Sequence, residues 1–292
     1  FYYFESFLIY MLQLCLISFT RIFVLSTNVI SHLFGRFAHT RFPKSMQYAI
    51  NRFYVDFFKI NLSEFESLES YPTLNALFTR KLIKPRILHT TPFNLISPTD
   101  SLITESGRIT QQTALQIKGK SYKVADLLGA VHDLDTYSFL NLYLSPKDYH
   151  HYHAPCDLEI LEAKYFSGKL LPVNFASLYK NENLFIQTER VVLKMRCKYN
   201  QSIMYYVAVG ALNVGKMQFL FDKAIQTNAK QGDCVYTYEK PIALNAGEEI
   251  GFFEMGSTIV LIAQANWSVK SGEIVRMGDQ IGTLESSMCL FF

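Results

Sequence analysis

The stretch Ile250-Gly-Phe-Phe-Glu-Met255, Gly256-Ser257-Thr258, Ile259-Val-Leu-Ile-Ala263 places two apolar runs on either side of a Gly-Ser bond. Both runs have the length and the aromatic and β-branched content of buried strands. A glycine in such a stretch usually marks a bulge, a bend or a close approach of backbones. Taken alone, the tripeptide therefore predicts a tight connection between two strands.

The pattern upstream of residue 90 is helical. Residues 28–60 place aromatic and basic side chains at helical spacing, which predicts two or three amphipathic helices suited to an anionic lipid surface. Solvated helices packed on the core would show the same pattern. Ser63, followed by Glu64, offers the N-cap of a further helix.

The pattern changes after that point. From Leu95 onward, short β-branched and aromatic runs alternate with turn residues, as in Leu102–Gly107 and Tyr205–Val209. Val124–Leu128 reads as one helical turn before Gly129. We therefore expect an α+β fold in which helices precede a β-rich domain.

The expected domain boundaries follow from this change of pattern. We assign residues 1–90 to a helical, membrane-associating region and residues 91–292 to the β-rich domain. Residues 269–284 predict two short strands around a Gly-Asp turn, a barrel-like hairpin similar to that of the lipoyl and biotinyl carriers. Those carriers present a lysine at the tip of the hairpin, and this chain has none there, so we expect the hairpin to be structural.

The first third of the chain decides how the protein meets a membrane. Ser6–Thr20 carries no charge over 15 residues, whereas a spanning helix needs about 20. The segment could still span if Arg21 snorkels, and a signal peptide is disfavoured because Glu5 stands where a basic residue belongs. We favour helices that lie in or against the membrane interface, with a buried core helix as the alternative.

Composition excludes some classes of function. A formal charge of +3 over 292 residues is too small to indicate a nucleic-acid partner. The five cysteines contain no CxxC pair, which favours free thiols over a disulfide framework or a zinc site. They are Cys15, Cys156, Cys197, Cys234 and Cys289.

Three of the seven histidines fall within four residues, in Asp148-Tyr-His-His-Tyr-His-Ala-Pro155. His150 and His153 would share a helix face, and His151 and His153 would share a strand face, so a metal site is one interpretation. The flanking prolines limit any helix, and no second His or Cys cluster supplies further ligands. We expect no metal, and a surface loop without chemistry is a further alternative.

Ser97-Pro98-Thr99-Asp100-Ser101 predicts a proline turn whose aspartate accepts backbone hydrogen bonds. The same carboxylate could orient an imidazole. Asp100, His153 and Ser257 are the residue types of base-assisted nucleophilic attack, although any chain contains such candidates.

Five blocks taken together resemble the phosphatidylserine decarboxylase proenzymes in order and spacing. The resemblance covers roughly residues 30–285 and is nearest to the bacterial membrane-associated type. Two positions depart from the family pattern, since Met255 stands where leucine is more usual and Ser101 where glycine is typical. The blocks are Leu77–Leu82, Ser97–Asp100, Ile117–Gly129, Tyr143–Asp157 and Glu248–Leu261.

The resemblance implies that the chain makes its own cofactor. Ser257 would attack the carbonyl of Gly256, with His153 as the base and Asp100 orienting it. The peptide would thereby become an ester, and elimination and hydrolysis would turn Ser257 into a pyruvoyl group. The cofactor would be this covalent pyruvate.

The implied reaction is the decarboxylation of phosphatidylserine to phosphatidylethanolamine. Self-cleavage would leave a large chain, residues 1–256, and a small chain, residues 257–292, in one catalytic domain. The ketone at Ser257 would form a Schiff base with the substrate amine. His150 would then protonate the carbanion left by the loss of CO₂.

The resemblance also implies a cellular setting and leaves rivals open. The expected partners are phosphatidylserine in the membrane and a second copy of the chain in a homodimer, with no nucleic acid. The expected location is peripheral, on the cytoplasmic face of the bacterial inner membrane. The rivals are a serine hydrolase or acyltransferase acting on lipids through Asp100, His153 and Ser257, and a non-catalytic membrane-binding β-domain; no G-x-S-x-G motif supports a hydrolase.

Overall fold

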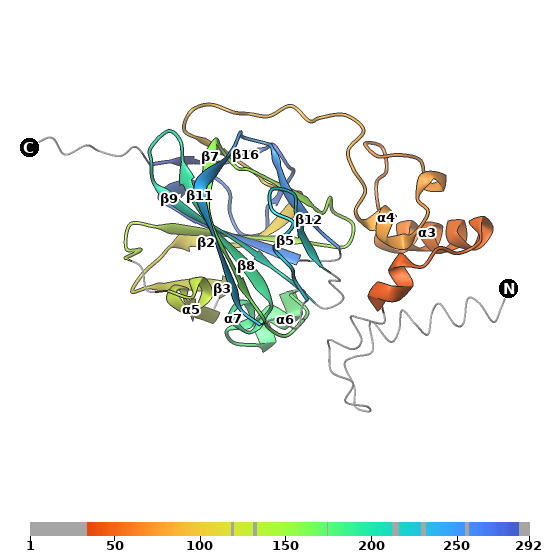
Figure 1. Ribbon diagram of the computed structural model, residues 1–292, viewed down its shortest axis with the longest axis horizontal. Helices are drawn as coiled ribbons and strands as arrows, with labels where there is room; N and C mark the ends of the chain where they lie inside the picture. The colour runs from red at the N-terminus through yellow and green to blue at the C-terminus, as the bar shows by residue number, and fades with distance from the viewer. Residues whose placement is uncertain are drawn as a thin grey trace, which may run out of the picture.

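The computed structural model describes most of the chain after residue 33 (Figure 1). The apolar stretch Ser6–Thr20 and the bond between Gly256 and Ser257 lie outside the described residues, because residues 255 and 256 are among the gaps. The described ranges are 34–117, 120–130, 133–173, 175–211, 216–228, 232–254 and 257–285.

The helix α3 (Lys44–Phe58) is amphipathic, as the sequence predicts. Its buried face carries Ile50 and Tyr54, whereas Tyr48, on the opposite side of the helix, is exposed. Buried polar side chains tie the helix to its neighbours, since Asn51 receives a hydrogen bond from Gln47 and donates one to the carbonyl of Tyr71. Whether the exposed face meets lipid stays a prediction.

Two short helices complete the helical end of the molecule. They are the 3₁₀ helix η1 (Leu68–Ser70) and α4 (Leu74–Phe78). The hydroxyl of Thr73 accepts a hydrogen bond from the backbone N–H of Ala76 and so caps α4. Within the described ranges no helix has the length and apolarity needed to cross a bilayer.

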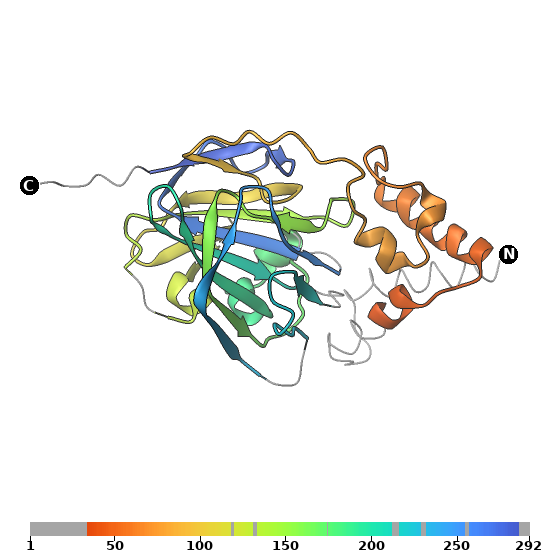
Figure 2. The same ribbon diagram turned by 45° about the horizontal axis from the view of Figure 1, so that its top comes forward.

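A segment without helix or strand, residues 79–93, leads from α4 to the sheets (Figure 2). The predicted helix start at Ser63 is wrong. The N–H of Ser63 is bonded to the side chain of Asn61 within a turn, and Glu64 is engaged in ion pairs. Ser63 and Glu64 thus have their partners within a turn and in ion pairs, and no helix begins there.

An eight-stranded antiparallel sheet forms the body of the molecule, in the order β11-β7-β8-β9-β13-β5-β2-β15. All residues of its inner strand β13 are buried, because β5 and β9 flank it on either side. The strands are β2 (Ser101–Arg108), β5 (Ser138–Leu144), β7 (Leu158–Phe166), β8 (Arg190–Cys197), β9 (Ile203–Val209), β11 (Cys234–Leu244), β13 (Ser257–Ala263) and β15 (Ile274–Val275).

Smaller sheets surround this body and carry the functional candidates. One has the order β10-β12-β6, another β1-β16-β14, and β3 pairs with β4. Their strands are β1 (Asn94–Ile96), β3 (Thr113–Ile117), β4 (Lys120–Lys123), β6 (His151–His153), β10 (Met217–Phe219), β12 (Glu249–Phe253), β14 (Ala265–Trp267) and β16 (Gln280–Leu284). The remaining short helices are α5 (Val124–Leu128), α6 (Phe175–Lys180) and α7 (Leu184–Gln187).

The strands on either side of the Gly-Ser bond belong to different sheets. β12 lies between β10 and β6, whereas β13 lies inside the eight-stranded sheet. The chain therefore changes sheet at the undescribed residues 255 and 256.

The α+β class and several local predictions are confirmed. The expected strands at 102–107 and 205–209 lie within β2 and β9, and α5 ends at Gly129 with a φ of 67°. β15 and β16 flank the turn at Gly278, but β15 pairs with β2 and β16 with β1 and β14. The two expected strands are present, but they do not pair with each other as the predicted hairpin would. The two-domain division at residue 90 stays a prediction.

We predict that Gly251→Ala destabilises the protein. An added Cβ would lie 1.9 Å from the carbonyl oxygen of Gln218 and 2.7 Å from the hydroxyl of Tyr152, so β12 would have to move away from its neighbours. The expected loss is about 1–3 kcal/mol of unfolding free energy, seen as a lower melting temperature. Gly35→Ala is the matched control, because nothing lies within 4 Å of its added Cβ; equal melting temperatures would contradict the packing at Gly251.

Candidate active site

The histidine block forms the strand β6, which a proline turn holds from one side. The backbone N–H of His153 donates to the carbonyl of Pro98 at 2.9 Å. The hydroxyl of Thr99 lies 3.1 Å from the carbonyl oxygens of both Tyr149 and His151. The Ser97–Asp100 turn is thus present as predicted, and its backbone and threonine fix the histidine strand.

The strand β12 holds the histidine block from the other side. His153 lies opposite Glu249, and the N–H of Phe253 donates to the carbonyl of His150 at 3.0 Å. Strand alternation then separates the side chains into two faces. Tyr149 stacks on His151 and His153, at ring distances of 5.1 and 5.8 Å, whereas the ring of Tyr152 packs on the opposite face against Phe253.

The imidazole of His153 is neutral and has a defined tautomer. Its Nδ1 lies 2.9 Å from the carbonyl oxygen of Gly247, so Nδ1 carries the proton. Its Nε2 then accepts a hydrogen bond from the hydroxyl of Tyr149 at 3.2 Å. Burial lowers the pKa of His153 to about 4, so its Nε2 lone pair is available as a base at neutral pH.

The side chain of His151 lies between β12 and the segment that follows α4. Its Nδ1 lies 2.5 Å from a carboxylate oxygen of Glu249, and its Nε2 lies 3.0 Å from the carbonyl oxygen of Thr79. Both ring nitrogens face acceptors, so neither is free to exchange a proton with a substrate. His151 therefore links β6 and β12 to the segment that follows α4.

His150 presents an unpaired nitrogen in a buried environment. Its Nδ1–H donates to the carbonyl of Asp148 at 2.8 Å, and its ring packs on Phe78. Its Nε2 is buried and makes no hydrogen bond with the described residues. Burial, followed by the positive charge of Arg80, lowers the pKa of His150 well below its ordinary value, so the free Nε2 is an acceptor.

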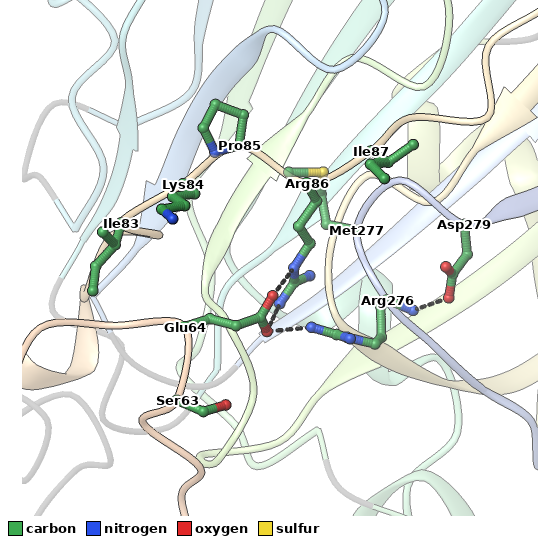
Figure 3. A pocket seen from close by; sticks show the side chains of 10 residues that line it. All are labelled: Ser63, Glu64, Ile83, Lys84, Pro85, Arg86, Ile87, Arg276, Met277 and Asp279. Atoms are coloured by element: carbon green, nitrogen blue, oxygen red, sulfur yellow. Dashed lines mark hydrogen bonds and ion pairs between the residues drawn. The ribbon is translucent and has the colours of Figure 1, made fainter.

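The carboxylate of Asp100 is bound by Arg86. Arg86 contacts both oxygens, with a distance of 3.0 Å for Nη2, and the backbone N–H of Met277 donates to Oδ1 at 2.8 Å. Arg86 also pairs with Glu64 (Figure 3). Its guanidinium lies 5.7 Å from the ring centre of Tyr149.

Asp100 and His153 are thus connected indirectly. The path runs from Asp100 to Arg86, from Arg86 to the ring of Tyr149, and from the Tyr149 hydroxyl to His153. No hydrogen bond in the described part of the chain joins Asp100 to His153. Ser101, the departure from the family pattern, is the first residue of β2 and does not have a positive φ.

Ser257 is the first residue of β13 and is completely buried. It lies opposite Leu144, and its Oγ makes no hydrogen bond with the described residues. The carbonyl of His150 is bonded to Phe253, four residues before Ser257, whereas His153 is opposite Glu249. The structure therefore places the histidines beside β12 and Ser257 at the start of β13, in a different sheet, without joining Ser257 to either histidine.

A cavity of about 240 Å³ opens beside His153. Apart from Gly247, its polar lining combines cationic, anionic and aromatic groups, which suits a small zwitterionic head group. The lining residues are Lys81, Leu82, Pro85, Arg86, Leu88, Tyr149, His153, Gly247, Glu249 and Met277. No group of three or more His, Cys, Asp or Glu residues in the described ranges could hold a metal ion.

The sequence did not indicate three residues of this site. Arg86, Tyr149 and Glu249 contact Asp100, His153 and His151 respectively. Tyr149 lies inside the histidine block and could have been suspected from that position alone. Arg86 and Glu249 carry no local signal, because their roles depend on contacts between distant segments.

Comparison with known proteins decides the family. The model of the phosphatidylserine decarboxylase family matches residues 74–283, a range that contains every candidate described above. The chain belongs to this family. The resemblance stated from the sequence motifs is therefore confirmed, and the match does not support a serine hydrolase or a non-catalytic binding domain.

Individual members of the phosphatidylserine decarboxylase family are similar over nearly their whole length. A phosphatidylserine decarboxylase proenzyme of Helicobacter pylori is 52% identical over 265 residues, covering 89% of this chain and 98% of its own. The proenzyme of Campylobacter jejuni is 44% identical, covering 86% and 97%. That of Brevibacillus brevis is 34% identical, covering 89% and 95%.

The lowered pKa of His153 predicts a dependence of stability on pH. The unfolded state, with a histidine pKa of about 6.5, binds more protons than the folded state below that pH. The free energy of unfolding should therefore fall as the pH falls from about 6.5 to 4, by up to about 3 kcal/mol from this residue. Urea unfolding across this range should give a shallower decline for His153→Gln, and identical declines would contradict the assignment.

Proposed function

We propose that the chain cuts itself between Gly256 and Ser257 and then decarboxylates phosphatidylserine with the pyruvoyl group made from Ser257. The observation that carries this proposal is the position of Ser257. Its buried hydroxyl has no hydrogen-bond partner in the described chain, at the point where the backbone passes from one sheet to another. A buried hydroxyl without a partner is costly for stability, and a catalytic role is one explanation for it.

Residue 257 also fits the implied cofactor. The hydroxyl of the adjacent Thr258 is buried without a hydrogen-bond partner among the described residues, and the β13 residues after it are apolar and buried. The surroundings exclude water, which protects a reactive carbonyl. Met255, a near-isosteric replacement for leucine, should not disturb this fit.

The maturation chemistry uses groups of this chain and one water molecule. The Oγ of Ser257 attacks the carbonyl carbon of Gly256, the C–N bond breaks, and an ester forms while the amine of residue 257 is freed. Removal of the α-proton of residue 257 then breaks the ester C–O bond and releases the carboxylate of Gly256. Hydrolysis of the remaining dehydroalanine gives ammonia and the ketone.

His153 is the proposed base for these proton transfers. Its neutral Nε2 has the required lone pair, which the Tyr149 hydroxyl occupies at rest. Asp100 would orient His153 through Arg86 and Tyr149, since these two residues lie between them. A shift of the Tyr149 side chain is then the change that exposes Nε2.

Decarboxylation requires an electron sink, and a ketone at residue 257 supplies one. General acid–base catalysis alone gives only about 10²–10⁴-fold acceleration. The proposed substrate fits the charges lining the cavity beside His153, because its head group carries a phosphate, a carboxylate and an ammonium. Lys81, Arg86 and Glu249 are the charged groups there.

His150 is the proposed proton donor to the substrate carbon. Its resting Nε2 has no proton, since Nδ1–H is held by Asp148. His150 must therefore take up a proton before it can give one. The substrate ammonium, which has to lose a proton before its nitrogen can act as a nucleophile, is the source that we propose.

The proposed setting is a membrane surface. The substrate phosphatidylserine lies in a bilayer, so the chain would act peripherally, on the cytoplasmic face of a bacterial inner membrane. Residues 1–90 would form the membrane-associating region and residues 91–292 the catalytic domain. Residues 1–256 and 257–292 would stay together after the cut, because β13 is inside the sheet, and two copies would form a homodimer.

Ser257→Ala should leave one uncut chain without a carbonyl that reacts with hydrazine reagents. The reason is that alanine has no oxygen to accept the acyl group. Gel electrophoresis and a carbonyl-reactive label measure both properties. Ser101→Ala is the matched control, because Ser101 is also buried with an unpaired Oγ; it should be cut normally, and cleavage of Ser257→Ala would refute the scheme.

The two histidines should separate maturation from turnover. His153→Ala is expected to stay uncut, since no base then acts on Ser257. His150→Ala should be cut, yet its kcat should fall by about 10²–10⁴-fold. Electrophoresis and CO₂ release give the two readouts, and an uncut His150→Ala chain would show that these roles are assigned wrongly.

A further inference from the structure

We propose that residues 81–89 form the surface that contacts an anionic phospholipid bilayer, with Ile83 and Ile87 inserted among the lipids at the mouth of the His153 cavity. This inference rests on the proposed function, because it names the face through which that substrate arrives. It concerns a segment with neither helix nor strand, between α4 and β1.

The segment turns two isoleucines outward, whereas Leu82, Arg86 and Leu88 are partly buried. Arg86 points inward to Glu64 and Asp100, and Leu88 packs against the buried cluster that contains Tyr149. Ile83 and Ile87 are left 53% and 86% exposed. No other hydrophobic side chain among the exposed ones in the described ranges is as exposed as Ile87.

Hydrogen bonds fix this arrangement of the segment. The N–H of Ile83 donates to the carbonyl of Glu64 at 3.0 Å, and the N–H of His89 lies 3.4 Å from the carbonyl oxygen of Gly278. Pro85 limits the backbone between these two anchors. The isoleucines are therefore presented by a braced loop, which lowers the entropy lost when they insert.

The charge of this part of the chain suits an anionic surface. From Ser70 to Thr99 there is no acidic residue, while four basic residues occur. Lys84 is exposed between the two isoleucines and makes no ion pair within the described chain, so its ammonium is available to lipid phosphates or carboxylates. Of these basic residues Arg80 is buried and Arg86 is paired with Glu64 and Asp100, so Lys81 and Lys84 carry the exposed positive charge.

The proposed surface leads directly to the candidate active site. A groove of about 560 Å³ lies between Ile83, Lys84 and Ile87 on one side and Arg276 and Asp279 on the other (Figure 3). The groove and the cavity beside His153 are both lined by Pro85, Arg86 and Met277. A lipid with its chains still in the bilayer could thus extend its head group past Arg86 toward His153.

The bilayer is a better occupant of this face than a second copy of the chain. Two outward isoleucines flanking a lysine give the apolar and basic mixture of membrane-interface segments. The proposed lipid substrate must also reach the cavity without leaving the bilayer completely. A subunit interface here would cover the groove that leads to the cavity.

Vesicle binding and turnover of the full chain test the proposal. Ile83→Ser and Ile87→Ser should each weaken binding to vesicles of phosphatidylcholine and phosphatidylserine by about tenfold, since each removes one buried aliphatic side chain. Lys84→Gln should weaken it by about fivefold at low salt only. Val235→Ser is the matched control: Val235 is 60% exposed on β11, at the opposite edge of the eight-stranded sheet from β15.

A second measurement tests directly whether the side chain at position 87 enters the bilayer. The tryptophan of Ile87→Trp should add fluorescence that brominated phosphatidylcholine quenches in vesicles containing phosphatidylserine. The fluorescence added by Val235→Trp should not be quenched. Unquenched fluorescence at position 87 would overturn the proposal even if other parts of the chain hold the protein on the vesicle. A change in oligomeric state without a change in vesicle binding would identify the face as a subunit contact and also overturn it.

The substrate form separates this inference from the proposed function. The Ile83→Ser/Ile87→Ser double variant should raise KM for phosphatidylserine in vesicles and leave kcat/KM unchanged for a short-chain phosphatidylserine that is monomeric in solution. Equal loss on both substrates would contradict a role in membrane contact. Absence of turnover on both by the wild-type chain would instead refute the proposed function.

Discussion

The hydrogen bonds that hold β6 between the Ser97–Asp100 turn and β12 are the constraint on which the rest of the structure depends. They place His153 against Pro98 and the carbonyl of His150 against Phe253. The turn thereby fixes the histidines from one side, and the strand that runs toward Ser257 fixes them from the other. The proposed base His153 lies in β6, the proposed proton donor His150 directly precedes it, and β12, which pairs with β6, is followed by the bond proposed to be cut.

Burial gives the two histidines their chemical character. Both His150 and His153 hold a proton at Nδ1 by a backbone carbonyl, and burial lowers the pKa of each. A neutral imidazole with a defined Nε2 lone pair can accept a proton, and its lowered pKa makes the protonated form a stronger proton donor. Arg86, in contrast to the neutral histidines, is charged, and it pairs with the carboxylate of Asp100 within the site. Because Arg86 lines both the groove and the cavity, it lies between the proposed lipid-contacting surface and the proposed catalytic residues.

The sequence predicted the elements whose signals are local. The strands around Leu102 and Tyr205, the helical turn before Gly129 and the proline turn at Pro98 were all recognisable from a few neighbouring residues. The family, and with it the candidate residues, followed from motifs that are each continuous in the chain. Ser63 was misjudged because a polar residue before an apolar run serves a turn as well as a helix.

Long-range contacts could not be predicted in this way. The pairing of β15 with β2, and the contacts of Arg86 and Glu249 with the site, join segments that share no sequence pattern. The intact mass of the purified wild-type protein tests the central claim most directly. Our account predicts two chains, of which one ends at Gly256 and the other begins at residue 257 with the mass of its sequence less one ammonia. A single uncut chain, or a second chain that still begins with serine, would contradict it.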